Sequence, residues 1–279
     1  MVSRFTAWET MLGAGGRAGI RALEHERPAW FRSLVEAHTD HVTTLDALVR
    51  ALRARGLQHR ILHSLDGVDP AGADLVVTAG GDGTVLYASH SVDSTPVLGV
   101  KSSRHSAGWL TGARSADVEE KIDAFLGGTI SRTTFQRMAV TVGGRLRHDK
   151  VLNDALYSHP NPAVTTRYVI EAGGRSEEHL SSGVWIGPAA GSTAALRSAG
   201  GRIVPPSSTD LQFVVREPIR ARGPRLRLLR GFVGEGGELG ILNRWQPARL
   251  YLDGPHLVVN VRPGEAVAYR LSSMPLTLL

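Results

Sequence analysis

The stretch from Asp74 to Leu86, DLVVTAGGDGTVL, constrains the fold of this 279-residue chain more than any other. Leu75, Val76 and Val77 form a continuous apolar run, which is typical of a parallel strand buried on both faces. A glycine-rich turn with one acid follows, and the next residues predict a helix. Because a short strand that turns directly into a helix is a βα unit, we expect an N-terminal α/β domain with a parallel sheet.

The glycine-rich turn has the composition of a phosphate-binding turn. Gly80, Gly81 and Gly83 lack the Cβ atoms that would keep backbone amides away from an anion, and the following helix offers its positive end. Thr84 adds a hydroxyl and Asp82 a carboxylate. The turn is therefore predicted to bring a phosphate and an acid together.

Strands and helices alternate over residues 1–130. A stub of a strand at Val2–Phe5 precedes a glycine-containing loop or interrupted helix, and TPVLGV predicts a second apolar strand that ends at Lys101. Helices are predicted from Thr44 to Arg55 and from near Ser115 to Gly127, with a strand over Arg60–His63. This alternation supports the α/β prediction for residues 1–130.

The pattern changes after residue 131. Short runs with strand periodicity, separated by Gly, Pro and Asp turns, continue to residue 279; examples are RYVIEAGG, LQFVV, RLYLDG and HLVVNV. They predict a mostly antiparallel, sandwich-like all-β domain over residues 131–279. Its last residues are candidates to return to the first domain.

Composition excludes several classes of site and partner. With no cysteine there are no disulfides and no thiolate ligands, and no protein metal site is predicted. No apolar run reaches the roughly 18 residues of a membrane span, and the acids near the N-terminus do not suit a transit peptide. We therefore expect a cytoplasmic protein with no membrane partner.

The net charge of +6 does not by itself indicate nucleic acid. The basic residues are spread along the chain, with one cluster over Arg216–Arg230. No nucleic-acid partner is expected, and the charge fits a polyanionic small molecule such as a nucleotide equally well.

Two polar islands interrupt the apolar runs of the second half. In VLNDALYSHPNP, Asn153 and Asp154 lie side by side in a strand-like run. An adjacent amide and carboxylate suit sugar hydroxyls and an amide, since together they donate and accept hydrogen bonds. The alternative is an ordinary turn or strand-end pair.

The second island, SSGVWIGPAAGSTAALRSAGG, predicts a strand, a small-residue loop over Gly187–Gly191, and a short helix from Ser192 or Thr193. Small residues allow a ligand to lie against the backbone, and the two hydroxyls could bind it. The same hydroxyls could instead only cap the helix.

Taken together and in this order, the three stretches resemble the NAD kinase family. The family motifs correspond here to Gly80-Gly81-Asp82-Gly83-Thr84, to Leu152-Asn153-Asp154, and to Gly191-Ser192-Thr193-Ala194 followed by SAGG at residues 198–201. Diacylglycerol and sphingosine lipid kinases share the first motif, so the two later motifs make the resemblance specific. Two departures are similar to the mitochondrial-type branch: the RHSAGWL stretch after Lys101, which itself replaces asparagine, and Ser182 in place of the usual acid. Ala195 replaces an aromatic residue, which implies an adenine side of the pocket that is looser or filled from elsewhere.

The resemblance implies a fold of the NAD kinase and diacylglycerol kinase type and transfer of the terminal ATP phosphoryl group to the 2′-hydroxyl of the adenosine ribose of NAD, giving NADP. Asp82 would accept the hydroxyl proton. Binding roles fall to Gly80, Gly81, Gly83, Thr84, Lys101, Asn153, Asp154, Gly191, Ser192, Thr193 and Ala194, with Mg²⁺ accompanying ATP and NAD as substrate. A homodimer or homotetramer is also implied.

Three alternatives remain open from the sequence. A lipid kinase would explain GGDGT but would leave Asn153, Asp154 and SAGG without a role. A catalytically weak NAD(P)-binding sensor would explain the changes at Lys101, Ser182 and Ala195. A nucleic-acid-binding module is motivated only by the isoelectric point near 10.1.

Overall fold

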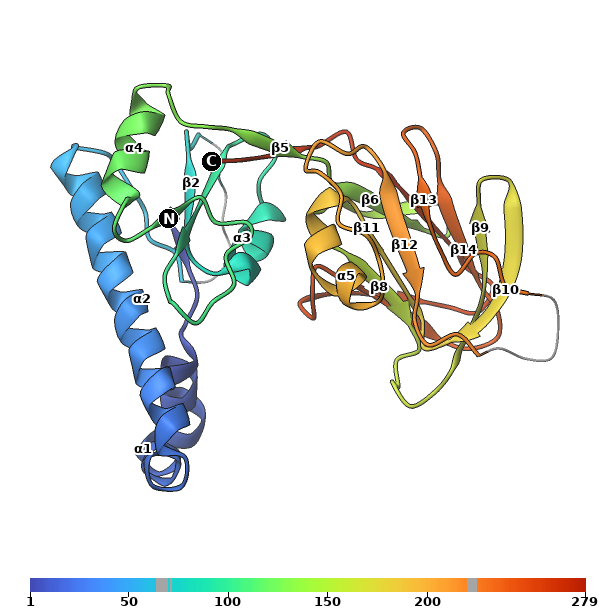
Figure 1. Ribbon diagram of the computed structural model, residues 1–279, viewed down its shortest axis with the longest axis horizontal. Helices are drawn as coiled ribbons and strands as arrows, with labels where there is room; N and C mark the ends of the chain where they lie inside the picture. Colours follow the sequence, from blue (N-terminus) through green and yellow to red (C-terminus); the bar gives the residue numbers. More distant parts are fainter. Residues whose placement is uncertain (64–69, 71, 220–224) are drawn as a thin grey trace. The chain divides into compact units, whose positions relative to one another are not determined.

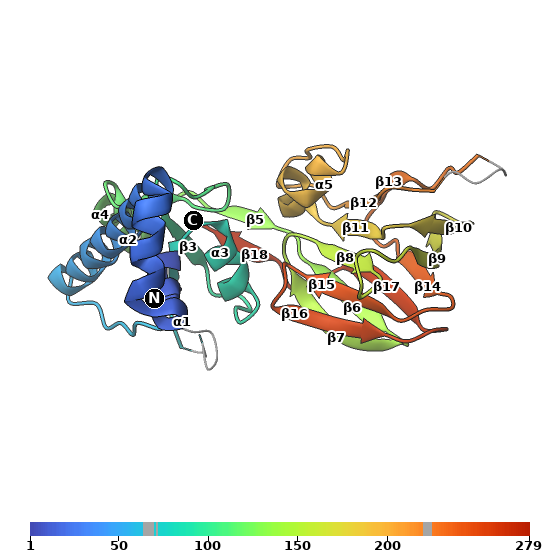
Figure 2. The same cartoon turned by 90° about the horizontal axis from the view of Figure 1, so that it is seen from below.

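The computed structural model describes residues 1–63, 70, 72–219 and 225–279, and these form two compact units (Figures 1 and 2). The first unit comprises Met1–Thr133 together with Thr277–Leu279, and the second comprises Thr134–Leu276. The polypeptide therefore passes between the units twice. None of the helices in the described ranges is long and apolar enough to cross a membrane.

The first unit is built on a mostly parallel sheet in the order β1-β2-β3-β18-β5, with β4 also paired to β3. β1, β2, β3, β4 and β18 pair in parallel, so their carboxyl ends share one edge. The strands are β1 (Val2–Ser3), β2 (Val76–Gly80), β3 (Val97–Lys101), β4 (Ala113–Arg114), β5 (Thr133–Phe135) and β18 (Leu276–Leu278).

Helices cover both faces of this sheet. α2 (Pro28–Ala54) and α4 (Val118–Leu126) pack on one face, and α3 (Asp82–Ser89) lies on the other (Figure 1). The apolar faces of α2 and α4 supply Leu48 and Ile122 to a core that includes Val77 and Leu98 of the strands. Both faces of β2 and β3 are thus covered, which explains their continuous apolar sequences.

Two helices lie between β1 and β2, and the sequence predicted this segment only in part. α1 (Ala7–Glu26) begins with a capping box between Thr6 and Glu9 and is broken at Gly16, whose φ is 59°. The interrupted-helix interpretation of this segment is confirmed. The predicted start of the next helix at Thr44 is wrong, because α2 already begins at Pro28, which occupies its first turn. α2 packs against α1, and none of its residues before His41 is buried, so the first half of the helix shows no clear apolar stripe.

The predicted strand over Arg60–His63 is also wrong. Only Leu62 pairs, through an isolated parallel bridge to Val2. Ile61 is 40% exposed, so the segment touches the sheet edge at one residue and is not incorporated into it.

The second unit contains two antiparallel six-stranded sheets, in the orders β10-β9-β14-β17-β6-β7 and β13-β12-β11-β8-β15-β16. Inward-facing residues of both sheets form one core that includes Tyr157, Tyr168, Ile186, Phe213 and Ile241. This confirms the predicted fold class. The strands are β6 (Met138–Val142), β7 (Arg145–Val151), β8 (Ala155–Ser158), β9 (Thr166–Ala172), β10 (Arg175–Ser181), β11 (Val184–Gly187), β12 (Leu211–Val215), β13 (Arg230–Val233), β14 (Leu239–Asn243), β15 (Ala248–Leu252), β16 (Leu257–Val261) and β17 (Ala266–Leu271).

The connection from β11 to β12 differs from the prediction of a helix starting at Ser192 or Thr193. A 3₁₀ turn, η1 (Ala189–Thr193), comes first, and the four-residue helix α5 (Ala195–Ser198) follows. Ala194 is the residue before α5, so neither predicted hydroxyl caps this helix.

Candidate functional site

The GGDGT motif lies at the carboxyl edge of the first unit's sheet. Gly80 ends β2, Gly81 precedes α3, and Asp82 is the first residue of that helix. A Cβ at Gly80 would lie 2.0 Å from the Thr84 hydroxyl oxygen, so only glycine leaves Thr84 in place. In open parallel sheets, ligands bind outside this carboxyl edge. The motif therefore occupies the position where a phosphate ligand is expected.

Not all the predicted phosphate contacts of the motif are available. The Thr84 amide already donates to the Gly81 carbonyl at 2.9 Å. Thr84 can therefore offer its hydroxyl but not its N–H to a ligand. Around Gly83 there is open space, since no heavy atom lies within 4 Å of a built Cβ.

The Asp82 carboxylate holds the chain that follows β3. One oxygen accepts the Leu110 amide at 2.9 Å and the other accepts the Trp109 amide at 3.1 Å. These bonds fix the direction of the carboxylate, and each oxygen still has a second lone pair. Asp82 is thus pre-oriented to accept a further hydrogen bond.

Residues 102–112, which we call the β3–β4 loop, are also attached to α2. The Asp40 carboxylate accepts two hydrogen bonds from the Arg104 guanidinium, at 2.9 and 3.0 Å, and these bonds lower the pKa of Asp40. Buried His41 contacts Ser102 at 2.7 Å through Nδ1 and Ser3 at 3.0 Å through Nε2, and burial lowers its pKa. His41 is therefore a structural histidine.

A cavity of about 240 Å³ opens beside the motif, between the β3–β4 loop and the start of the chain. Gly80 and Thr84 form one part of its wall. Groups that suit an anion complete it; they include Arg4, Ser102, Ser103, His105 and Ser106. The predicted phosphate-binding turn therefore lies beside a cavity whose side chains suit a phosphate.

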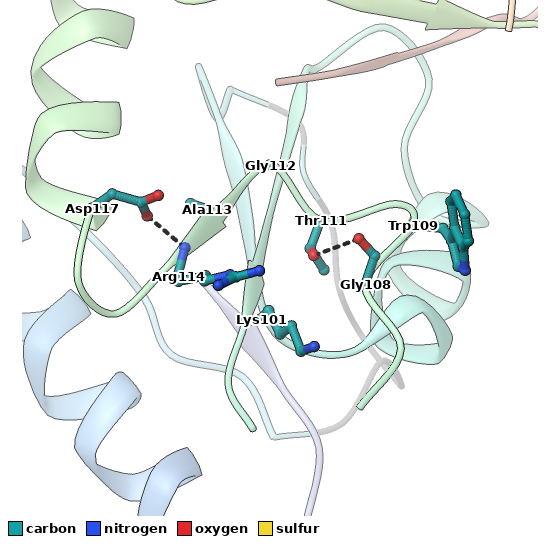
Figure 3. Close-up of a pocket in the computed structure, with 8 residues that line it drawn as sticks. All are labelled: Lys101, Gly108, Trp109, Thr111, Gly112, Ala113, Arg114 and Asp117. Atoms are coloured by element: carbon teal, nitrogen blue, oxygen red, sulfur yellow. Dashed lines mark hydrogen bonds between the residues drawn. The ribbon is translucent and has the colours of Figure 1, made fainter. Parts of the chain in front are cut away.

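Lys101 and Arg114 add two positive charges at the same carboxyl edge of the sheet. Gly80 is in register with Lys101, and Lys101 with Arg114, so the three lie side by side. Figure 3 shows the two cations at a second cavity, of about 280 Å³, with Asp117 on one side and exposed Trp109 on the other. Two neighbouring positive charges at this edge favour a polyanionic ligand.

The later motifs meet each other in the second unit. Asn153 and Asp154 lie between β7 and β8, rather than within a strand as the sequence suggested. Gly191 packs so closely on them that a Cβ would lie 1.7 Å from the Asn153 carbonyl oxygen, and a Cβ on Gly187 would lie 2.3 Å from the same oxygen. Two segments almost 40 residues apart therefore form one small-residue surface.

The side chains at this surface are mostly committed. Ser192 is fully buried and its hydroxyl accepts the Val204 amide at 3.2 Å, while the Thr193 hydroxyl donates to the Ala190 carbonyl at 3.2 Å. Asn153 Nδ2 donates to Asp154 Oδ2 at 3.2 Å. The backbone amide of Ala194, the remaining predicted residue, donates a hydrogen bond to the Gly191 carbonyl at 3.0 Å.

Sequence reasoning missed Asp253, in the turn after β15. Its carboxylate accepts the backbone amides of Leu152, Asn153 and Asp154 at 2.8, 2.7 and 3.0 Å. Asp253 stands in RLYLDG, where the sequence predicts only a turn after a strand. Its positive φ of 50° is the one unusual feature, and this is visible only in the structure.

Comparison with known proteins identifies relatives of this chain. Residues 24–130 match the family described as the ATP-NAD kinase N-terminal domain. A probable NADH kinase from Oryza sativa subsp. japonica is 36% identical over 217 residues, covering 70% of this chain and 67% of the relative. An NADH kinase from Arabidopsis thaliana is 33% identical over 232 residues, covering 70% and 68%.

Solved structures share the fold. The chain matches an NAD kinase from Archaeoglobus fulgidus in complex with ATP, with a TM-score of 0.68 at 20% identity over 84% of this chain and 88% of the other. A yeast NADH kinase complexed with NADH gives a TM-score of 0.70 at 17% identity, covering 86% and 79%.

Proposed function

Because this chain belongs to the NAD kinase family, as its motifs predicted, we propose that it transfers the terminal phosphoryl group of ATP to the 2′-hydroxyl of the adenosine ribose of NAD, giving NADP. One observation in particular supports this reaction. The GGDGT motif lies at the carboxyl edge of a parallel sheet and lines a cavity with cationic and hydroxyl groups.

Asp82 is the proposed proton acceptor. The Trp109 and Leu110 amides hold its carboxylate in one orientation. The remaining lone pairs of the carboxylate therefore already have a fixed direction before substrate binds. As the 2′-hydroxyl attacks the phosphorus, Asp82 takes its proton. Base catalysis of this kind is worth about 10²- to 10⁴-fold in rate.

Charge neutralisation is the second task of the first unit. Phosphoryl transfer proceeds through a loose transition state with negative charge on the phosphoryl oxygens. Gly80, Gly81 and Gly83 allow close approach of the backbone, and the Thr84 hydroxyl lines the same cavity. Lys101, in place of the family's asparagine, adds a positive charge at the neighbouring strand end.

The second unit is the proposed holder of the dinucleotide. Asn153 and Asp154 supply the amide and carboxyl groups that suit ribose hydroxyls and a carboxamide. The small-residue segment over Gly191–Ala194 provides a surface for the adenosine. Since the hydroxyls of Ser192 and Thr193 are used internally, shape rather than hydrogen bonding is their proposed contribution.

Mg²⁺ is proposed to arrive with ATP. Among the residues that the structure describes, no group of three or more His, Asp or Glu side chains could hold a metal ion. GGDGT itself offers one carboxylate, that of Asp82, which suits an ion bound mainly by phosphate oxygens and water. The ion would offset charge on the transferred group.

Incubation of the purified protein with ATP, Mg²⁺ and either NAD or NADH tests the proposal. NADP or NADPH should form, and Asp82→Asn should reduce kcat by about 10²- to 10⁴-fold. Undiminished turnover in the variant would remove Asp82 from the mechanism. Lipid phosphorylation without NADP would favour the lipid kinase alternative, and saturable NAD binding without product would favour the sensor.

We also propose that the protein assembles as a homodimer or homotetramer, as the resemblance implies. Light scattering of the purified chain would give the mass of the particle, and a mass of one chain would contradict this.

A further inference from the structure

The turn that joins β15 to β16 is hydrogen-bonded to the backbone of the Asn153-Asp154 segment. Three consecutive backbone amides, those of Leu152, Asn153 and Asp154, converge on the single carboxylate of Asp253. A return bond runs from the Asp253 amide to the Asp154 carbonyl at 2.8 Å. Four hydrogen bonds with Asp253 thus fix the path of the segment. Asp253 belongs to none of the three motifs that carry the family resemblance.

The same arrangement places two carboxyl groups close together in a poorly solvated region. Asp154 is only 5% exposed, and burial together with the charge of Asp253 raises its pKa to about 7. Burial also raises the pKa of Asp253, to about 6, although its three amide hydrogen bonds and the fully buried Arg137 oppose this. Two like charges this close resist ionising together.

The two carboxyl groups are not equivalent. Asp253 accepts three hydrogen bonds from backbone amides, which favour its ionised form, and Arg137 adds a favourable charge. Asp154 receives one side-chain bond, from Asn153. Asp253 therefore ionises first, and the proton of the pair remains on Asp154.

We propose that Asp253 is a positioning residue of the dinucleotide site, which fixes the Asn153-Asp154 segment and, through its charge, makes binding of the dinucleotide release a proton from Asp154. The inference rests on the proposed function, in which Asp154 meets a ribose hydroxyl. A hydroxyl donates a stronger hydrogen bond to a carboxylate than to a neutral acid. Ligand binding therefore selects the ionised form of Asp154.

Titration calorimetry of NAD binding to the intact protein, in two buffers of different ionisation enthalpy, counts the released protons. At pH 7 Asp154 is about half protonated, so we expect roughly half a proton per NAD bound. Between pH 6 and pH 8 the affinity should rise about tenfold, which follows from the ionised fraction. NAD binding without proton release would overturn the inference and leave the proposed function standing, whereas absence of NAD binding would overturn both.

Asp253→Asn separates the charge of Asp253 from its hydrogen bonds. The amide oxygen can still accept two of the three backbone donors, but the charge beside Asp154 is gone. We expect NAD binding to weaken at pH 8. Because burial still raises the pKa of Asp154 while the charge of Asp253 no longer does, the change in affinity between pH 6 and pH 8 should shrink below tenfold. A uniform weakening at every pH, with proton release retained, would show a merely structural role.

Two further variants control the experiment. Asp154→Asn should abolish proton release while leaving Asp253 in place. Asp210→Asn removes an acid of the same unit that holds no part of the segment, and should keep the pH dependence of the native chain. If Asp253→Asn does not fold, the proton count of the native chain and of Asp154→Asn still decides the question.

Discussion

Replacing Gly191 by alanine tests how the two motifs of the second unit depend on each other. The added Cβ would lie 1.7 Å from the Asn153 carbonyl oxygen and 2.6 Å from its carbonyl carbon. Carbon atoms of this kind do not approach other heavy atoms closer than about 3.0 Å, so the two backbone segments must separate by at least about 1.3 Å. Neither neighbour is the end of a flexible side chain that could move aside.

The size of the effect follows from that separation. Overpacking of a closed site costs about 1–3 kcal/mol of stability. A displacement of about 1 Å in a positioning segment reduces turnover by roughly 10²-fold. We therefore expect kcat/KM for NAD to fall by about 10²-fold and the melting temperature to drop by a few degrees.

An NADP-forming assay with varied NAD and saturating ATP measures the first effect. KM for ATP should stay within about twofold of the native value, because the GGDGT motif belongs to the other unit. Gly234→Ala is the matched control: its Cβ would meet its nearest neighbour at an ordinary 3.6 Å. Native kcat/KM for NAD in Gly191→Ala would refute the idea that this contact shapes the dinucleotide site.

Two further predictions concern single polar groups. Thr84→Val keeps the shape of the side chain but removes the hydroxyl that lines the cavity beside the motif, so KM for ATP should rise about 10-fold or more in steady-state kinetics, while KM for NAD is unchanged. Equal changes in both constants would count against a phosphate contact. The raised pKa of Asp154 means that the folded state keeps a proton which the unfolded chain loses near pH 4, so the free energy of unfolding should fall by on the order of 4 kcal/mol as the pH rises from about 4 to about 7. Asp253, whose pKa is also raised, adds to this fall, so denaturant titrations at several pH values should show a steeper profile in the native chain than in Asp154→Asn; matching profiles would contradict a buried, proton-holding Asp154.

The fold class was predictable because its signals are local. A continuous apolar run followed by a glycine turn marks β2 and α3, and period-two runs mark the strands of the second unit. Each of these segments buries the face that its own sequence displays. The family could be predicted for the same reason, since its motifs are contiguous.

The missed features depend on contacts between distant segments. The role of Asp253 arises from amides about 100 residues earlier, and its own neighbourhood indicates only a turn. Likewise, the hydrogen bonds between Arg104 and Asp40 connect positions 64 residues apart, and no local sequence pattern indicates them. The early start of α2 was hidden because none of its residues before His41 is buried, so its first half shows no apolar stripe.

The double passage of the chain between the units has a consequence for the order of folding. The second unit is inserted into the first, because β18 returns to pair with β3 at Leu278↔Val97. Leu276 and Leu278 are both buried, so the first sheet lacks part of its interior until they arrive. On the ribosome, the unit that carries Asp82 therefore begins first and finishes last. A nascent chain stalled at residue 270 would hold a complete set of motif residues on an incomplete phosphate-binding domain.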